Sequence, residues 1–120
     1  MAIKTFRDLI AWQKAMVLAK EIYTVTKQLP KSEQFGLTAQ MRRAAVSIPS
    51  NIAEGHGRES PADFLRFLRI ARGSLMELQT QLMLAADIGF LGSQVEVDAI
   101  LQETDRVLQG LIRSITDHQD

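Results

Sequence analysis

The chain has 120 residues, contains no cysteine and carries 14 basic and 14 acidic side chains, so its formal net charge is zero. This length suits one domain, and the lack of cysteine excludes disulfides, thiolate catalysis and cysteine-ligated metal sites. A neutral chain has no bulk attraction for nucleic acid, so any such binding must come from a local patch. Hydrophobic residues make up 46% of the chain, which is enough to build a buried core.

Charge is distributed unevenly along the chain. Residues 1–60 hold 9 basic and 5 acidic side chains, and residues 61–120 hold 5 basic and 9 acidic ones. This asymmetry fits either complementary solvated helix faces or the pairing of subunits. The first four residues lack the apolar stretch of a signal peptide, and no segment approaches the roughly 18 apolar residues of a membrane span. We therefore expect a cytoplasmic protein with no membrane partner.

Start and stop signals predict four long helices over residues of about 5–29, 32–55, 60–88 and 93–116. Each begins with a hydroxyl residue that can cap free backbone N–H groups, namely Thr5, Ser32, Ser60 and Ser93. Pro61 follows one of these caps at the first helical position, where proline is favoured. The helices end at Leu29-Pro30, at Gly55-His56-Gly57 and near Gly89 and Gly92.

The apolar residues within these segments recur with a helical period. The third segment has the spacing 4,3,4,3,4,3, which is typical of a coiled-coil seam; its members are Phe64, Leu68, Ala71, Leu75, Leu78, Leu82 and Ala85. The other segments contain similar seams, and short connections make successive helices antiparallel. The sequence therefore predicts an all-α, antiparallel up-and-down four-helix bundle as one domain over residues 1–120. Pro49 predicts a kink in the second helix.

The first helix has more apolar residues than one seam needs. Leu9, Trp12, Met16, Ala19 and Tyr23 form one line, and a second line runs beside it through Leu18, Ile22, Val25 and Leu29. Ile10 and Val17 add to the surplus. This excess indicates either a broad core stripe or a second apolar face used in self-association.

The most informative stretch is RRAAVSIPSNIAEGHGR, over residues 42–58. Four of its polar residues, at a spacing of 4,4,3, form one stripe along the second helix; they are Arg43, Ser47, Asn51 and Glu54. The third helix presents a facing line that includes Gly73 and Glu77. One interpretation is a structural polar motif of these six residues, in which Arg42 or Arg43 reaches Glu77 and sets the helix register. A helix that keeps Gly73 at its centre is expected to have a close neighbour there.

The alternative interpretation is an arginine-rich surface that contacts phosphates. Its members lie on the second and third helices and in the turn between them; they are Arg42, Arg43, Arg58, Arg66, Arg69 and Arg72. The turn at residues 55–58 is either a simple helix stop or a small anion cradle. The fourth helix carries Glu96, Asp98, Glu103 and Asp105, so we expect a poor surface for phosphates there.

The sequence contains none of the common catalytic motifs. No Glu-x-x-His pair of the di-iron bundles, no helical His pair for zinc and no phosphate-binding loop occurs in it. The only histidines are His56, between two glycines, and His118, near the end. We therefore expect no catalytic residue, no metal and no cofactor. A small hydrolase or nuclease would have to depend on His56.

Taken together, these motifs resemble the four-helix-bundle family first described from ribosomal-RNA intervening sequences. The resemblance extends from Phe6 to about Leu91; it includes Trp12-Gln13, Arg42-Arg43-Ala44, Ser47-Ile-Pro-Ser-Asn51-Ile-Ala-Glu54-Gly55 and Ala71-x-Gly73-Ser74-x-x-Glu77-Leu78. It implies a subunit of a ring-like homopentamer. It also implies kinship with the accessory proteins of diversity-generating retroelements, which bind nucleic acid and a reverse transcriptase.

The predicted function is therefore that of a non-catalytic, homo-oligomeric protein associated with RNA or DNA, with a reverse transcriptase as a further partner. The alternative is a structural assembly protein that binds no nucleic acid and uses its arginines only to join helices.

Overall fold

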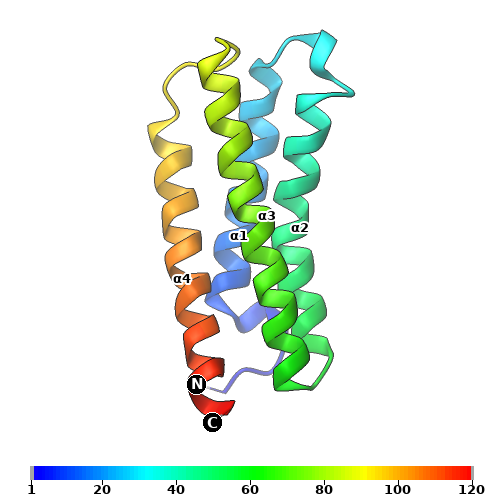
Figure 1. Cartoon of the computed structure of the whole chain (residues 1–120), viewed down its shortest axis with the longest axis vertical. Helices are drawn as coiled ribbons and strands as arrows, with labels where there is room; N and C mark the ends of the chain where they lie inside the picture. Colours follow the sequence, from blue (N-terminus) through cyan, green and yellow to red (C-terminus); the bar gives the residue numbers. More distant parts are fainter. Residues whose placement is uncertain (1, 120) are drawn as a thin grey trace.

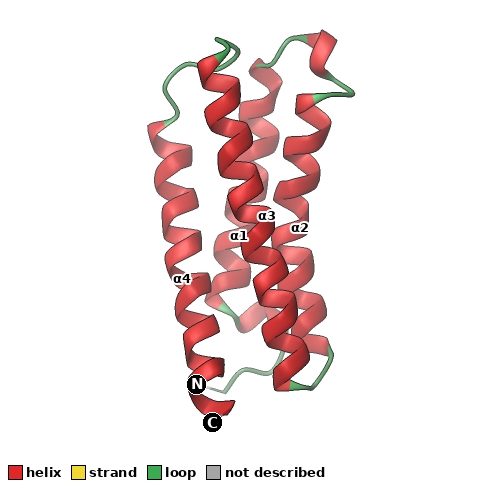
Figure 2. Ribbon diagram, viewed as in Figure 1, coloured by secondary structure: helices red, strands yellow, loops and turns green. Residues whose placement is uncertain are grey.

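The computed structural model describes residues 2–119, and side chains within residues 2–117. Its long helices are α1 (Ile10–Val25), α2 (Leu37–Gly57), α3 (Pro61–Asp87) and α4 (Val95–Gln119). They form an elongated bundle of 47 × 25 × 22 Å, with no strand in the described part of the chain (Figures 1 and 2). The predicted all-α, four-helix architecture is confirmed.

Each helix packs against its neighbours in the sequence, and α4 closes the bundle by packing against α1. The most extensive contact is between α2 and α3. Successive helices run in opposite directions, and both chain ends therefore lie at one end of the bundle (Figure 1). Within residues 2–119, no helix combines the length and the hydropathy that crossing a membrane requires.

The first two helices begin later than the capping signals predicted. Thr5 caps a short 3-10 helix, η1 (Phe6–Asp8), and Leu9 is extended before α1 starts. Asp8 completes this capping box by accepting from the backbone N–H groups of Thr5 and Lys4, and these bonds lower the pKa of the Asp8 carboxyl.

The start of α2 is also shifted along the chain. Ser32 lies in another 3-10 helix, η3 (Lys31–Glu33), and α2 starts after Gly36. The Glu33 side chain accepts from the Leu37 N–H at 3.1 Å, so a carboxylate takes the role expected of Ser32.

The cap of α3 agrees with the prediction. Ser60 Oγ accepts from the Asp63 N–H at 3.3 Å, and Pro61 takes the first helical position.

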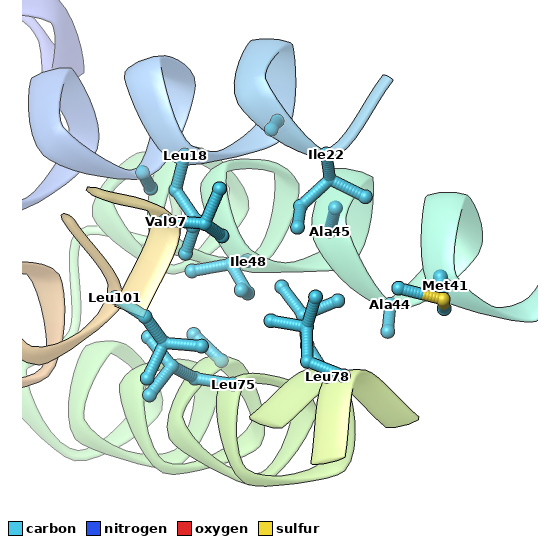
Figure 3. Packing of buried hydrophobic residues seen from close by; sticks show 14 of the residues in the cluster. Leu18, Ile22, Met41, Ala44, Ala45, Ile48, Leu75, Leu78, Val97 and Leu101 are labelled. Atoms are coloured by element: carbon cyan, nitrogen blue, oxygen red, sulfur yellow. The ribbon is translucent and has the colours of Figure 1, made fainter. Parts of the chain in front are cut away.

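The predicted seams form the core (Figure 3). All seam residues of α3 from Leu68 to Ala85 are buried, as are Met41 and Ile48 on α2 and Leu101 on α4. Each fully buried side chain of this size contributes about 1.5–3 kcal/mol relative to an exposed one. On α1 the buried line runs through Leu18 and Ile22, and Tyr23 on the other line is exposed.

Gly55 allows α2 and α3 to approach each other closely. A Cβ atom at Gly55 would lie 2.6 Å from Cβ of Phe67, a separation that real structures do not tolerate. The helix ends within the predicted stop at Gly55-His56-Gly57, since α2 continues to Gly57, but the close contact at Gly55 was not predicted. The chain turns at Glu59, which has a left-handed backbone with φ of 63°.

Gly73 behaves in the opposite way. Nothing lies within 4 Å of a Cβ atom built at this residue. The expectation that Gly73 makes room for a close neighbour is therefore wrong, and its position in mid-helix has no packing reason.

Pro49 lies inside α2, which is assigned as helix on both sides of it. Because proline has no N–H, the Ala45 carbonyl loses its usual donor. The side chain of Asn51 does donate to a backbone carbonyl, but that carbonyl belongs to Ser47, at 2.8 Å. The kink at Pro49 stays a prediction.

The Gly55 contact yields a stability prediction. Gly55→Ala forces Cβ into Phe67 and should lower the free energy of unfolding by about 1–3 kcal/mol, as overpacking does. Gly57→Ala is the matched control, because nothing lies within 4 Å of its Cβ position. The measurement is urea unfolding of both variants at one protein concentration. Equal stability of the two variants would contradict the close-contact explanation.

Candidate nucleic-acid interface

Arg42 connects α2 to α1. Its Nε donates to Thr26 Oγ1 at 2.9 Å, and its Nη2 donates to the Tyr23 carbonyl at 3.3 Å. The guanidinium also stacks over the Tyr23 ring, 4.6 Å from the centroid. Arg42 therefore has a structural role in the bundle, and it reaches α1 rather than Glu77.

Arg43 points elsewhere, because adjacent helical residues are turned by about 100° from each other. Its side chain is exposed and makes no hydrogen bond or ion pair within residues 2–117. Glu77 accepts from Gln81 Nε2 at 3.1 Å instead. The expected arginine–glutamate network between α2 and α3 is therefore not formed.

The centre of the predicted polar stripe does join α2 to α3. Ser47 Oγ lies 2.8 Å from Ser74 Oγ, and Asn51 Nδ2 donates to Ser47 Oγ at 2.9 Å. These groups satisfy one another at the partly buried edge of the helix pair. Ser74 completes the motif; it was not part of the predicted facing line, in which its neighbour Gly73 stood.

Arg58 and Arg66 both stack on the buried Phe67. Their guanidinium carbons lie 5.1 and 4.5 Å from the ring centroid. Each is also near an exposed carboxylate, Glu54 at 3.0 Å from Arg58 and Asp63 at 3.8 Å from Arg66. Exposed pairs of this kind contribute about 0.2–1 kcal/mol. The ring therefore orients two charges that remain available to a stronger ligand.

Arg72 makes an ion pair between α3 and α4 that the sequence did not reveal. Its Nε lies 3.0 Å from Asp105 Oδ1, and Gln109 Nε2 donates to the other carboxylate oxygen at 2.8 Å. Asp105 is only 9% exposed. This acid of α4 is therefore buried, whereas from the sequence it was expected among the surface acids. The sequence does hold one indication that Asp105 is buried: it directly follows Thr104, a polar residue on the core seam of the fourth helix.

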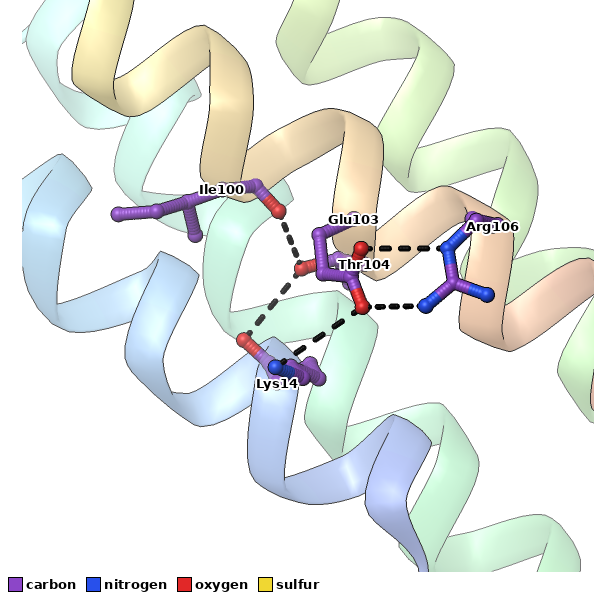
Figure 4. Close-up of polar contacts among 5 residues, drawn as sticks. All are labelled: Lys14, Ile100, Glu103, Thr104 and Arg106. Atoms are coloured by element: carbon purple, nitrogen blue, oxygen red, sulfur yellow. Dashed lines mark hydrogen bonds and ion pairs between the residues drawn. The ribbon is translucent and has the colours of Figure 1, made fainter.

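Next to Asp105 along α4, the contact of α4 with α1 is also polar (Figure 4). Thr104 Oγ1 lies 2.8 Å from the Ile100 carbonyl and 3.5 Å from that of Lys14. Glu103 accepts from Arg106 and lies 4.0 Å from Lys14 Nζ. The bond from Arg106 lowers the pKa of Glu103, and the same bond raises the pKa of Arg106. The charge of Arg106 is therefore engaged within α4.

The surplus apolar residues of α1 divide between core and surface. Leu9 and Leu18 are buried, whereas Ile10 and Val17 are exposed. A groove of about 420 Å³ lies between α1 and α2 and is mostly apolar; its lining is Trp12, Met16, Ala19, Lys20, Tyr23, Val46, Pro49 and Ser50. The predicted second apolar face therefore exists in part, as this groove.

His56 does not lie in a catalytic arrangement. Its ring packs edge-on against Phe64 at 5.7 Å, and it makes no hydrogen bond to another described side chain. The side chain of His118 lies outside the described residues. Within residues 2–117, no group of three or more acidic or histidine side chains is placed to hold a metal ion.

The fold and the site thus define a helical bundle with arginines on two adjacent helices. The model of the 23S rRNA-intervening sequence protein family matches residues 7–113, and the chain belongs to this family. A similar solved structure is that of a protein of unknown function from the S23 ribosomal protein family of Bacteroides thetaiotaomicron VPI-5482. It has a TM-score of 0.76 and 25% identity, and the match covers 87% of this chain and 96% of that one. No curated protein gives a match.

The adjacent pair Arg42 and Arg43 gives a matched test of structural and free arginines. Arg42→Ala removes the charged hydrogen bond to Thr26 and the stacking on Tyr23, and should lower the free energy of unfolding by about 1–2 kcal/mol. Arg43→Ala removes no contact and should change it by less than about 0.5 kcal/mol. Urea unfolding measures both. If Arg43→Ala lowers the free energy of unfolding more than Arg42→Ala does, the predicted network of Arg43 with Glu77 would be supported instead.

Proposed function

We propose that this chain is a non-catalytic subunit of a homo-oligomer and acts as an accessory protein that binds RNA or DNA. The observation that carries the proposal is the state of the arginines on α2 and α3. Arg43 and Arg69 are exposed and have no acidic partner in the described part of the chain. Arg58 and Arg66 are oriented by Phe67 and held only by weak surface pairs.

Such arginines suit phosphate contacts better than they suit structure. A guanidinium binds a phosphate through two parallel hydrogen bonds, which are stronger than a bond to a solvated carboxylate. Each phosphate that is neutralised also releases condensed counterions. Because Arg58 and Arg66 are already stacked on a ring, little side-chain entropy is lost on binding.

The family supports RNA as the first nucleic acid to test, since its description refers to sequences that intervene in 23S rRNA. A reverse transcriptase as a protein partner follows only from the resemblance to retroelement accessory proteins. A homopentamer follows from the same resemblance.

The groove between α1 and α2 supports self-association. It exposes Trp12, Met16 and Val46 beside Pro49, and an apolar surface of this kind in a polar setting is typical of protein interfaces. In the alternative function, the protein assembles through this groove and binds no nucleic acid. The exposed arginines would then have no ligand. Nucleic-acid binding assays separate the two functions, because both include the oligomer.

The nucleic-acid proposal predicts salt-dependent binding of a labelled RNA in fluorescence anisotropy. Arg43→Ala and Arg66→Ala should each weaken binding and reduce the slope of log affinity against log salt by about one. Lys31→Ala, in η3 between α1 and α2, is the control and should change neither. If micromolar wild-type protein binds neither RNA nor DNA at low salt, the nucleic-acid proposal fails.

The oligomer proposal predicts that a charge in the α1–α2 groove separates the subunits. Val46→Lys should weaken association at least tenfold in analytical ultracentrifugation, because the ammonium would be buried without a partner. Ile70→Lys on α3 is a matched control, since Val46 and Ile70 are both 43% exposed. A monomeric wild-type protein, or equal effects of the two variants, would contradict this assignment.

A further inference from the structure

The groove between α3 and α4 carries a second concentration of arginines. Its volume is about 460 Å³, within the range of about 300–1,000 Å³ that is usual for small-molecule sites. Its lining comes from both helices: Arg69, Arg72, Gly73, Met76, Gln109, Ile112 and Arg113. Three of these seven residues are arginines, and none carries a carboxylate.

The three arginines are arranged so that their charge faces the groove. Asp105 binds only Nε of Arg72, at 3.0 Å, so both terminal nitrogens of that guanidinium keep their hydrogens for another acceptor. Gln109 donates to the second oxygen of Asp105 and so holds the acid against Arg72. Arg69 and Arg113 are exposed and form no ion pair within residues 2–117.

Gly73 opens this groove. A glycine in the middle of a helix costs about 1 kcal/mol relative to alanine. No packing contact compensates for this loss, since the space beside Gly73 is empty for 4 Å. A larger side chain would project into the groove between the arginines. We therefore explain the helix stability lost at Gly73 by the space that the glycine leaves for a ligand in the groove.

The fourth helix lines one side of this groove, although its exposed acids Glu96 and Asp98 remain as expected near the other end of the helix. Asp105 is buried against Arg72, and Glu103 is paired with Arg106. Arg113 lines the α4 side of the groove. A smaller hollow of about 260 Å³ continues along α4 and shares Gln109 and Arg113 with the groove. The lining of this hollow also includes Asp105 and Arg106, so it holds an acid that the groove itself lacks.

We propose that the groove between α3 and α4 is a phosphate-binding site formed by Arg69, Arg72 and Arg113, with Gly73 as its floor. The phosphate belongs to an RNA or DNA strand or to a free nucleotide. Guanidinium forks bind the phosphate oxygens, while Met76 and Ile112 offer apolar contact to the sugar or base. This proposal extends the proposed function, because it adds Arg113 and Gly73 and gives the phosphate a defined place.

The test uses the full chain and two probes: a labelled 12-nucleotide single-stranded RNA in fluorescence anisotropy and adenosine monophosphate in isothermal titration calorimetry. Gly73→Leu places a side chain in the groove from a Cβ position with no neighbour within 4 Å, and should weaken binding at least fivefold while preserving or raising the melting temperature. Arg113→Gln should weaken it about three- to tenfold. Gly92→Leu is the control for added bulk, because Gly92 lies in the connection between α3 and α4 with empty space beside it, and it should bind like the wild type.

The outcomes separate this proposal from the nucleic-acid function as a whole. RNA binding that falls with Gly73→Leu supports the strand as the source of the phosphate, and nucleotide binding alone that falls with it supports the free nucleotide. RNA binding that is lost in Arg43→Ala but unchanged in Gly73→Leu and Arg113→Gln overturns the groove and keeps the function. Failure of both probes to bind, or binding of a polyglutamate peptide in their place, overturns the phosphate site.

Discussion

The contact of Gly55 with Phe67 is the constraint on which the rest of the structure depends. Without a side chain at Gly55, the backbone of α2 lies directly against the first atoms of the Phe67 side chain. This closeness gives α2 and α3 the most extensive interface in the bundle and brings the hydroxyls of Ser47 and Ser74 within 2.8 Å. It also places the Phe67 ring where Arg58, just after α2, and Arg66 on α3 can stack on it.

The arginines of one short stretch of sequence have different roles because a helix turns them in different directions. Arg42 faces α1 and joins two helices, whereas the next residue faces solvent. On α3, Arg72 faces α4 and is partly neutralised by a buried acid, and Arg69 is exposed at the edge of the same groove. The chain is neutral as a whole, yet the groove between α3 and α4 is lined by three arginines and by no carboxylate.

Much of the fold could be predicted from local signals. The seam of α3 from Leu68 to Ala85 and the cap at Ser60 need only helical periodicity and backbone hydrogen bonding, so the sequence reveals them. The start of α2 could not be predicted in the same way, because Ser32 and Glu33 both can cap a helix and only the path of the preceding turn selects the carboxylate.

The site was less predictable than the fold. The close contact at Gly55 and the empty space at Gly73 were not predicted, since a glycine in a sequence looks the same whether it admits a neighbour or leaves a gap. The pair of Arg72 with Asp105 joins residues 33 positions apart, and no local pattern aligns them. What the sequence did show was the stripe of Ser47 and Asn51, because their spacing alone places them on one face.

The order of the helices around the bundle has a consequence for how the chain folds. Three of the four helix interfaces join segments that are adjacent in the sequence, and only the contact of α1 with α4 joins distant ones. Local interfaces form quickly because little chain entropy is lost in closing a short loop. We therefore expect the α2–α3 hairpin to act as the folding nucleus, with α4 docking onto α1 last, through Thr104 and the Lys14 backbone.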